Sequence, residues 1–235
     1  MPESFTNSIA IDGPAGAGKS TVAKEVARSL KFAYVDSGAI YRTCALYFIE
    51  KFSDKAKVVL NDENKVKQEL AKFDIDFTVS SDLNFTVLLN GADVGARIRT
   101  QEVSNFVASA ASLPSVRAKV NERLQNFALD NSVVMDGRDI GTCVLPKSRL
   151  KIFLTATPDI RARRRYDELV AKGERADYND ILIEVKKRDE MDEKRPVAPL
   201  VKAADAVVVD SSEMNALEVI EAILRAASKK FNLQD

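Results

Sequence analysis

Hydrophobic residues fall into two patterns that alternate along the first fifty positions of this chain. A continuous apolar run at residues 9–11 predicts a short buried strand. Apolar residues then recur at every fourth position, which predicts a helix with one buried face: Val22, Val26 and Leu30. Residues 32–36 and 40–49 repeat the succession of strand and helix. This order is typical of strand–helix–strand units with parallel strands.

The second half of the chain continues the alternation. Apolar strands are predicted at residues 132–135, 149–154 and 206–210, which brings the number of strands to five. One helix is expected to begin at Arg99 and the next at Pro114, because proline is accepted at the first helical position. The helix after Pro114 is expected to bury Val116, Val120, Leu124 and Phe127. The last helix is expected to bury Leu217, Ile220, Leu224 and Phe231. The pattern predicts an α/β fold, a five-stranded parallel sheet between two layers of helices.

The stretch 54–98 interrupts this alternation. Residues 54–72 are charged and prone to form helices. Residues 73–79 alternate with period two, and residues 85–94 predict another strand with a turn at Asn90-Gly91. We expect a small antiparallel insertion within one domain that spans residues 1–235.

Composition excludes several classes of function. Lys plus Arg and Asp plus Glu number 35 each, so no overall charge draws the protein to nucleic acid or to an anionic membrane. The chain contains no histidine, which excludes Ser-His-Asp and Cys-His catalysis as well as imidazole metal ligands. Its chemistry must therefore use carboxylates, Lys, Arg, backbone amides and an oxygen-bound cation such as Mg²⁺.

Cysteines and the N-terminus suggest the compartment. Cys44 and Cys143 lie far apart and form no metal-binding or redox motif, so we expect buried, reduced thiols. Residues 1–6 lack the basic region and apolar run of a signal peptide, and the chain has no apolar stretch of membrane-spanning length. A cytoplasmic protein that does not bind membranes is expected.

A glycine-rich stretch between the first strand and the first helix carries the clearest chemical signal. It matches G-x-x-x-x-G-K-[ST], in which backbone N–H groups and the start of a helix surround a phosphate. Lys19 is expected to reach the β- and γ-phosphates of a nucleotide, and the Ser20 hydroxyl to bind Mg²⁺. The residues of this motif, which are expected to bind nucleotide, are Gly13, Pro14, Ala15, Gly16, Ala17, Gly18, Lys19 and Ser20.

Further candidates follow the other predicted strands, at the sheet edge where ligands bind in such folds. Ser37 is expected to cap the second helix, and Arg42 lies in its first turns, where it could reach an anion. Taken alone, they are a plain cap and a surface charge. The segment 136–139, Asp-Gly-Arg-Asp, is either a ligand-binding turn or a turn with an internal ion pair.

The region between the fourth and fifth strands is rich in charge. Arg161, Arg164 and Arg165 have the spacing of one helix face, as do Arg188 and Asp192. Two readings stay open for this region. One is a solvated pair of helices held by salt bridges. The other is a mobile lid whose arginines close over phosphates.

Several segments together resemble the bacterial cytidylate kinase family of P-loop nucleoside monophosphate kinases. They are Asp-Ser-Gly-Ala-Ile-Tyr-Arg at 36–42, Ile-Arg-Thr-Gln-Glu-Val at 98–103, Asp-Gly-Arg-Asp-Ile-Gly-Thr at 136–142, Arg-Asp-Glu-Met-Asp at 188–192 and Val-Ala-Pro-Leu at 197–200. The resemblance covers essentially the whole chain. It implies a three-layer P-loop kinase fold with an antiparallel insertion at 54–98 on the monophosphate side and an arginine-rich helical lid at 157–195.

The resemblance also implies an activity. The expected reaction is transfer of the γ-phosphoryl group of ATP to CMP or dCMP, with Mg²⁺, by a monomer. The family pattern implies that Ser37, Arg42 and Arg138 hold the CMP phosphate, that Arg117 and Asp139 face cytosine, and that Arg188 and Asp192 meet the sugar. It implies that the stretch from Gly13 to Thr21 holds the ATP phosphates. It also implies catalytic roles for Lys19, Arg138, Arg161, Arg164 and Arg165.

One position departs from the family pattern. Where the family has a serine that contacts the base, this chain has Ala108, with Ser109 beside it. Other readings also stay open: a kinase for UMP or another small acceptor, and a nucleotide-dependent switch. The chain lacks the Asn-Lys-x-Asp string that a guanine-binding switch would carry.

Overall fold

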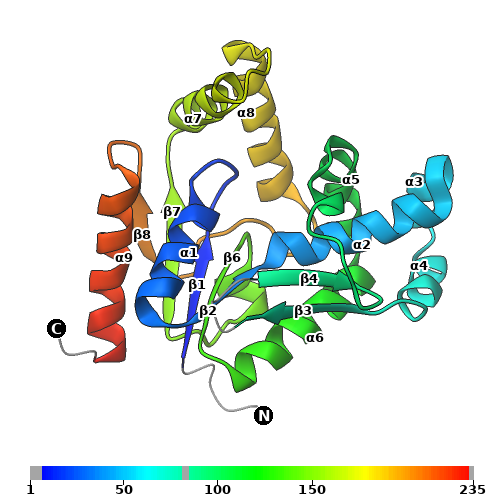
Figure 1. Ribbon diagram of the computed structural model, residues 1–235, viewed down its shortest axis with the longest axis horizontal. Helices are drawn as coiled ribbons and strands as arrows, with labels where there is room; N and C mark the ends of the chain where they lie inside the picture. The colour runs from blue at the N-terminus through cyan, green and yellow to red at the C-terminus, as the bar shows by residue number, and fades with distance from the viewer. Residues whose placement is uncertain (1–6, 81–84, 233–235) are drawn as a thin grey trace.

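The computed structural model describes residues 7–80 and 85–232. Five parallel strands form the large sheet in the order β2-β6-β1-β7-β8 (Figure 1). This confirms the five-stranded parallel sheet predicted from the pattern. The strands are β1 (Ser8–Asp12), β2 (Ala33–Asp36), β6 (Val133–Gly137), β7 (Leu150–Thr155) and β8 (Val207–Asp210).

Helices cover both faces of the sheet because the strands are apolar on both sides. Ile9 and Ile11 of β1 pack with α1 (Lys19–Leu30) and α9 (Ala216–Phe231). Ala10, between them, faces the opposite core, which contains side chains of α2 (Ser37–Phe52) and α6 (Pro114–Asp130). The alternation of side chains along a strand thus divides the interior into two cores.

The insertion forms a separate antiparallel sheet in the order β3-β4-β5. At the turn between β4 and β5, Asn90 and Gly91 have φ angles of 51° and 80°, the left-handed values that a tight hairpin needs. Phe77 of β3 packs on Phe127 of α6, with ring centroids 4.8 Å apart, which joins this sheet to the main body. The elements are α3 (Ala56–Leu60), α4 (Glu63–Leu70), β3 (Ile75–Val79), β4 (Phe85–Leu89) and β5 (Ala92–Asp93).

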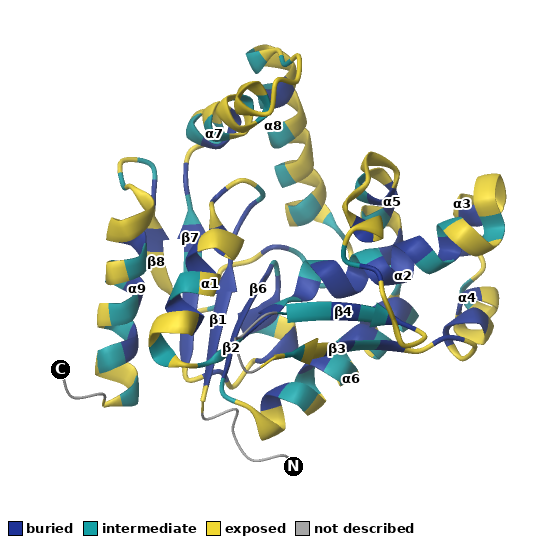
Figure 2. Ribbon diagram, in the orientation of Figure 1, coloured by how far each residue is buried: buried dark blue, intermediate teal, exposed yellow. Residues whose placement is uncertain are grey.

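Two further parts overlook the carboxyl ends of the strands. One is α5 (Gln101–Ala111), and the other is a hairpin of α7 (Pro158–Ala171) and α8 (Tyr178–Lys194). Figure 1 shows the hairpin projecting from the side of the sheet where the glycine loop lies. Figure 2 shows that the hairpin is largely exposed, in contrast to the buried strands β1 and β6. None of the helices in the described ranges is long and apolar enough to cross a membrane.

Four local predictions were wrong. Asp36, not Ser37, caps α2, because its carboxylate accepts the N–H of Ala39 at 3.0 Å. The helix expected at Arg99 begins two residues later, after Thr100 as its cap. Leu217 is 72% exposed, and Cys143 is exposed rather than buried. Residues 1–6, on which the expectation of no signal peptide rests, lie outside the described residues.

Candidate active site

The glycine loop at residues 13–18 joins β1 directly to α1 and is shaped by its glycines. A Cβ atom at Gly13 would overlap the carbonyl oxygen of Leu154 in β7, so this position requires a glycine. Gly16 and Gly18 have φ angles of 77° and 87°, which side chains rarely adopt. The loop leads straight into Lys19, the first residue of α1, so the positive end of the helix dipole faces its concave side.

Lys19 is buried, and its Nζ donates to the carbonyl oxygen of Pro14 at 2.7 Å. Burial, and then the nearby charge of Arg138, lower the pKa of Lys19. An anion in the loop would offset both effects. The Lys19 side chain therefore lies inside the loop, with its ammonium group against Pro14. A phosphate bound in the loop would give this ammonium group an ionic partner.

Ser20 Oγ donates to Asp136 Oδ2 at 3.0 Å. Asp136 is buried at the end of β6, and its other oxygen accepts the hydroxyl of Tyr34 at 2.8 Å. Burial raises the pKa of Asp136, and the neighbouring Asp36 raises it further. A hydroxyl and a carboxylate beside a phosphate site are the hard oxygen ligands that suit Mg²⁺, so these residues fit the metal.

β6 has β1 on one side and β2 on the other, and a hydrogen bond joins the carboxyl ends of β2 and β6. Ser37 Oγ donates to the carbonyl oxygen of Asp136 at 2.7 Å. A Cβ atom at Gly137 would lie 2.7 Å from that hydroxyl oxygen, so this close approach requires a glycine. Ser37 is thereby placed beside the segment 136–139, although it does not cap the helix.

Four arginines lie close enough to influence one another's charge: Arg42, Arg99, Arg138 and Arg188. Burial, and then positive charge from Arg138, lower the pKa of Arg188 on α8. Burial also lowers the pKa of Arg42, to which Arg99 and Arg138 contribute. Arg42 Nη1 donates to Ser104 Oγ of α5 at 2.8 Å. Positive charges held together in this way would be stabilised by a bound anion.

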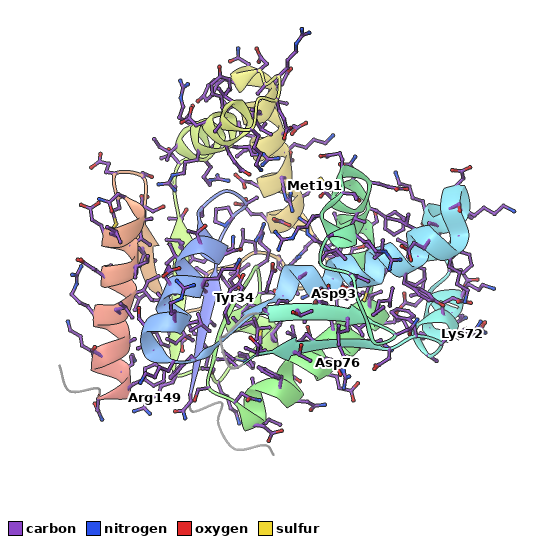
Figure 3. The ribbon with its side chains drawn as sticks, viewed as in Figure 1. Tyr34, Lys72, Asp76, Asp93, Arg149 and Met191 are labelled. Atoms are coloured by element: carbon purple, nitrogen blue, oxygen red, sulfur yellow. The ribbon has the colours of Figure 1, made fainter. Side chains whose placement is uncertain are left out.

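Asp192 pairs with Arg138 instead of with Arg188, its neighbour on the helix. Its Oδ2 accepts Arg138 Nε at 2.8 Å. The contact joins α8 to the loop that follows β6. Met191, labelled in Figure 3, marks the turn of α8 that carries Asp192.

Asp139 is the centre of a buried cluster. Its Oδ2 pairs with Arg117 of α6, and its Oδ1 accepts Arg195 Nη2 at 3.0 Å. Arg195 also donates to the carbonyl oxygen of Ala198. The two arginines hold both oxygens of the carboxylate in place, so a ligand that reaches this group would meet an acceptor in a fixed position.

The hairpin arginines have three different environments. Arg161 is buried, donates to the carbonyl oxygen of Ala15 at 3.0 Å, and makes a two-pronged pair with Asp189 at 2.8 and 2.6 Å. Arg164 donates to the Ser211 carbonyl oxygen at 2.6 Å, and Arg165 forms an exposed pair with Glu168 at 2.9 Å. Of these three arginines, Arg161 is the one that donates a hydrogen bond to the glycine loop in the described part of the chain.

Two residues of this site were missed from the sequence. Asp136 belongs to a segment that was singled out, but nothing in the pattern places it beside Ser20. Arg195 follows a helix full of charged residues, so its contact with Asp139 leaves no local signal. Ala108 and Ser109, at the position where a base-contacting serine was expected, are both exposed.

Comparison with known proteins identifies the family. The family model for cytidylate kinase matches residues 9–229. The chain belongs to the cytidylate kinase family. It is 46% identical over 222 residues to the cytidylate kinase of Carboxydothermus hydrogenoformans, covering 94% of this chain and 97% of that protein. It is 44% identical over 223 residues to the cytidylate kinase of Bacillus subtilis, covering 95% of this chain and 97% of that one.

Among solved structures, the fold is similar to that of an uncharacterized protein from Eubacterium ventriosum. The TM-score is 0.50 with 13% identity, over 95% of this chain and 99% of the other. The likeness concerns the fold alone. Membership of the cytidylate kinase family rests on the family model and on the sequence relatives.

Proposed function

We propose that the protein transfers the γ-phosphoryl group of ATP to CMP or dCMP, giving ADP and CDP or dCDP. Besides membership of the cytidylate kinase family, the proposal rests on one arrangement. The glycine loop follows β1, and Arg138 follows β6, which is the neighbouring strand. In the register of these two strands, Asp12 pairs with Gly137. A donor phosphate and an acceptor phosphate bound there would lie side by side.

The chemistry needs charge compensation and alignment more than proton transfer. The acceptor phosphate is already an anion, so the absence of histidine is no obstacle. Lys19 would bind the transferred phosphoryl group, while Arg138 and Arg42 would offset its repulsion from the acceptor phosphate. Ser20 and Asp136 would hold Mg²⁺, which neutralises charge on the β- and γ-phosphates when it is bound.

Acceptor recognition is assigned to residues on three sides of the loop after β6. Ser37, Arg42 and Arg138 hold the CMP phosphate in this proposal. Arg117 and Asp139 face the base, and Arg188 with Asp192 meets the sugar.

Two segments surround these groups. The hairpin within 157–195 serves as a lid, with Arg161, Arg164 and Arg165 brought over the phosphates when it closes. The insertion within 54–98 belongs to the monophosphate side. Closure would exclude the water that otherwise hydrolyses ATP.

We also infer that the protein is a cytoplasmic monomer that binds neither nucleic acid nor membranes. Size-exclusion chromatography with light scattering tests its oligomeric state.

An acceptor panel tests the function. ADP release from ATP and Mg²⁺ is measured with CMP, dCMP, UMP, AMP and no acceptor. We expect rapid turnover with CMP and dCMP. Fast turnover with UMP alone would identify a different kinase, and slow acceptor-independent hydrolysis would indicate a switch.

Lys19→Ala serves as the matched inactive variant. Its turnover should fall by about 10³ or more, the scale on which a transition-state cation matters in phosphoryl transfer. Burial lowers the pKa of Lys19, so the charged amine costs the folded state free energy, and its removal should not lower the unfolding temperature. Activity within about tenfold of the parent would remove Lys19 from the mechanism.

A further inference from the structure

Asp12, the last residue of β1, is a buried carboxylate with an unusual set of partners. Its side chain is 4% exposed. Oδ1 accepts the backbone N–H of Ile140 and Oδ2 that of Gly141, each at 2.7 Å. Both oxygens are thus used by two successive peptide groups of another segment.

These two bonds join the donor and acceptor sides of the site. Asp12 immediately precedes Gly13, where the glycine loop begins. Ile140 and Gly141 immediately follow Asp139 and form the start of a π-helix, Ile140–Val144. The backbone pairing of β1 with β6 ends at Asp12 and Gly137. The Asp12 side chain continues the connection where the backbone ladder stops.

The surroundings of this carboxylate make the contact specific. A Cβ atom at Gly141 would lie 3.3 Å from Asp12 Oδ2 and 3.1 Å from Lys151 Cδ, so the segment lies hard against both side chains. The ammonium group of Lys151 pairs with Asp205 at 2.9 Å. Within the described residues, Asp12 accepts its hydrogen bonds from the two N–H groups, and the charge of Lys19 lies nearby. Burial raises the pKa of Asp12 to about 6, which leaves it ionised, and a strong acceptor, at pH 8.

We propose that Asp12 is a positioning residue for acceptor recognition. Its carboxylate fixes the start of the π-helix beside the glycine loop, and through this segment it sets the places of Arg138 and Asp139 relative to the donor phosphates. The inference rests on the proposed CMP kinase activity. It predicts that damage to Asp12 harms the use of CMP much more than the binding of ATP.

Asp12→Asn is the test, because it preserves size but places an amide NH₂ against one of the two N–H donors. We expect kcat/KM for CMP to fall by roughly tenfold or more, the loss that accompanies removal of a hydrogen bond to a charged group. The dissociation constant of a non-hydrolysable ATP analogue should change by less than about twofold. Asp62→Asn is the matched control: Asp62 caps α4 by accepting the N–H of Lys65, away from the site, and its kinetics should match the parent.

A second readout does not depend on activity. Hydrogen exchange of the peptide covering residues 138–145, without substrates, should be faster in Asp12→Asn than in the parent and unchanged in Asp62→Asn. Unchanged CMP kinetics, or equal losses for CMP and the ATP analogue, would overturn the proposal.

If Asp12→Asn fails to fold, Gly141→Ala tests the same contact from its other side, because the added Cβ atom would lie 3.3 Å from Asp12 Oδ2. It should also raise KM for CMP while sparing the affinity for the ATP analogue, and parent-like kinetics would overturn the proposal. A parent protein inactive with CMP would instead refute the proposed function.

Discussion

At the scale of single residues, Asp139 is a buried carboxyl group held between two arginines. Its two oxygens pair with Arg117 and Arg195. A carboxylate accepts hydrogen bonds and cannot donate them. Cytosine offers an amino group where uracil has a carbonyl oxygen, so a carboxylate facing that position would favour cytosine and repel uracil.

Asp139→Asn should therefore reduce the preference for CMP over UMP, which we expect to be at least about 10² in kcat/KM for the parent, because a site built for one donor strongly rejects an analogue without it. The change should act mainly through lost CMP activity. Measuring both nucleotides for both proteins checks this. An equal loss for CMP and UMP would mean that Asp139 only holds its two arginines.

The same substitution should also lower stability. Breaking a buried ion pair costs about 3–5 kcal/mol when one charge is left without its partner. Urea unfolding of Asp139→Asn, compared with the parent, measures this loss. A CMP:UMP effect without a stability effect would show that Arg117 and Arg195 find other partners.

The two cysteines should differ sharply in reactivity. Cys44 is fully buried in α2, which raises the pKa of its thiol to about 12, whereas Cys143 is exposed. Since the thiolate is the reactive form, a disulfide reagent at pH 8 should modify one thiol of the native protein quickly and the second only after unfolding. Cys143→Ser should abolish the fast phase. Two fast thiols in the parent would contradict the packing of α2.

At the scale of elements, periodicity predicted the strands and helices well, because burial of a stripe is a property of the whole segment. It could not fix details that depend on a single neighbour. Either Asp36 or Ser37 can cap a helix, and only the path of the chain after β2 selects the first. Leu217 was placed inside because apolar residues occupy more than one stripe of α9, and packing against α1 selected Val219 and Ile223.

The candidate site shows the same limit. The position of the glycine loop between a strand and a helix was predicted because its residues are contiguous, and its role in binding nucleotide stays a prediction. Arg161, Arg164 and Arg165 share a helix spacing, yet the structure gives them three separate sets of partners. Contacts between distant segments, such as those of Asp136 with Ser20 or Arg195 with Asp139, leave no pattern in the sequence.

The contact between α4 and α2 should stabilise the fold to an extent that depends on pH. Glu69 of α4 is buried and accepts from Lys51 at 2.6 Å, Lys72 at 2.8 Å and Tyr47 at 3.0 Å. These partners, Lys51 first, lower the pKa of Glu69 to about 2. A lowered folded-state pKa stabilises the fold above the ordinary pKa of glutamate, and this gain disappears as the pH falls towards 2.

Glu69→Gln should accordingly be less stable than the parent at pH 7, with a smaller difference at pH 3.5. Urea unfolding at the two pH values provides the measurement. Glu221→Gln, which removes an exposed pair with Arg225, is the control and should change little at either pH. A difference for Glu69→Gln that does not depend on pH would show that shape, rather than charge, holds α4 to α2.

At the scale of the whole molecule, substrate binding should be visible as stabilisation. A ligand present at 100 times its dissociation constant adds about 2.7 kcal/mol to the free energy of unfolding. For a chain of 235 residues, we expect a rise of about 5–10 °C in the unfolding temperature with CMP. UMP at the same concentration should give a much smaller shift. Equal shifts for the two nucleotides would remove base selection from the binding step.

The order of the strands has a consequence for inhibitor chemistry. β6 lies directly beside β1, and neighbouring strands are about 5 Å apart. With the donor at the glycine loop and the acceptor at the loop after β6, as proposed above, a compound that joins a cytidine-like group to an adenosine-like group would have to bridge a single interstrand step. A short, stiff bridge should bind more tightly than a long, flexible one, because it has less conformational freedom to lose. The backbone hydrogen bonds between β1 and β6 in this way set the length of the best linker.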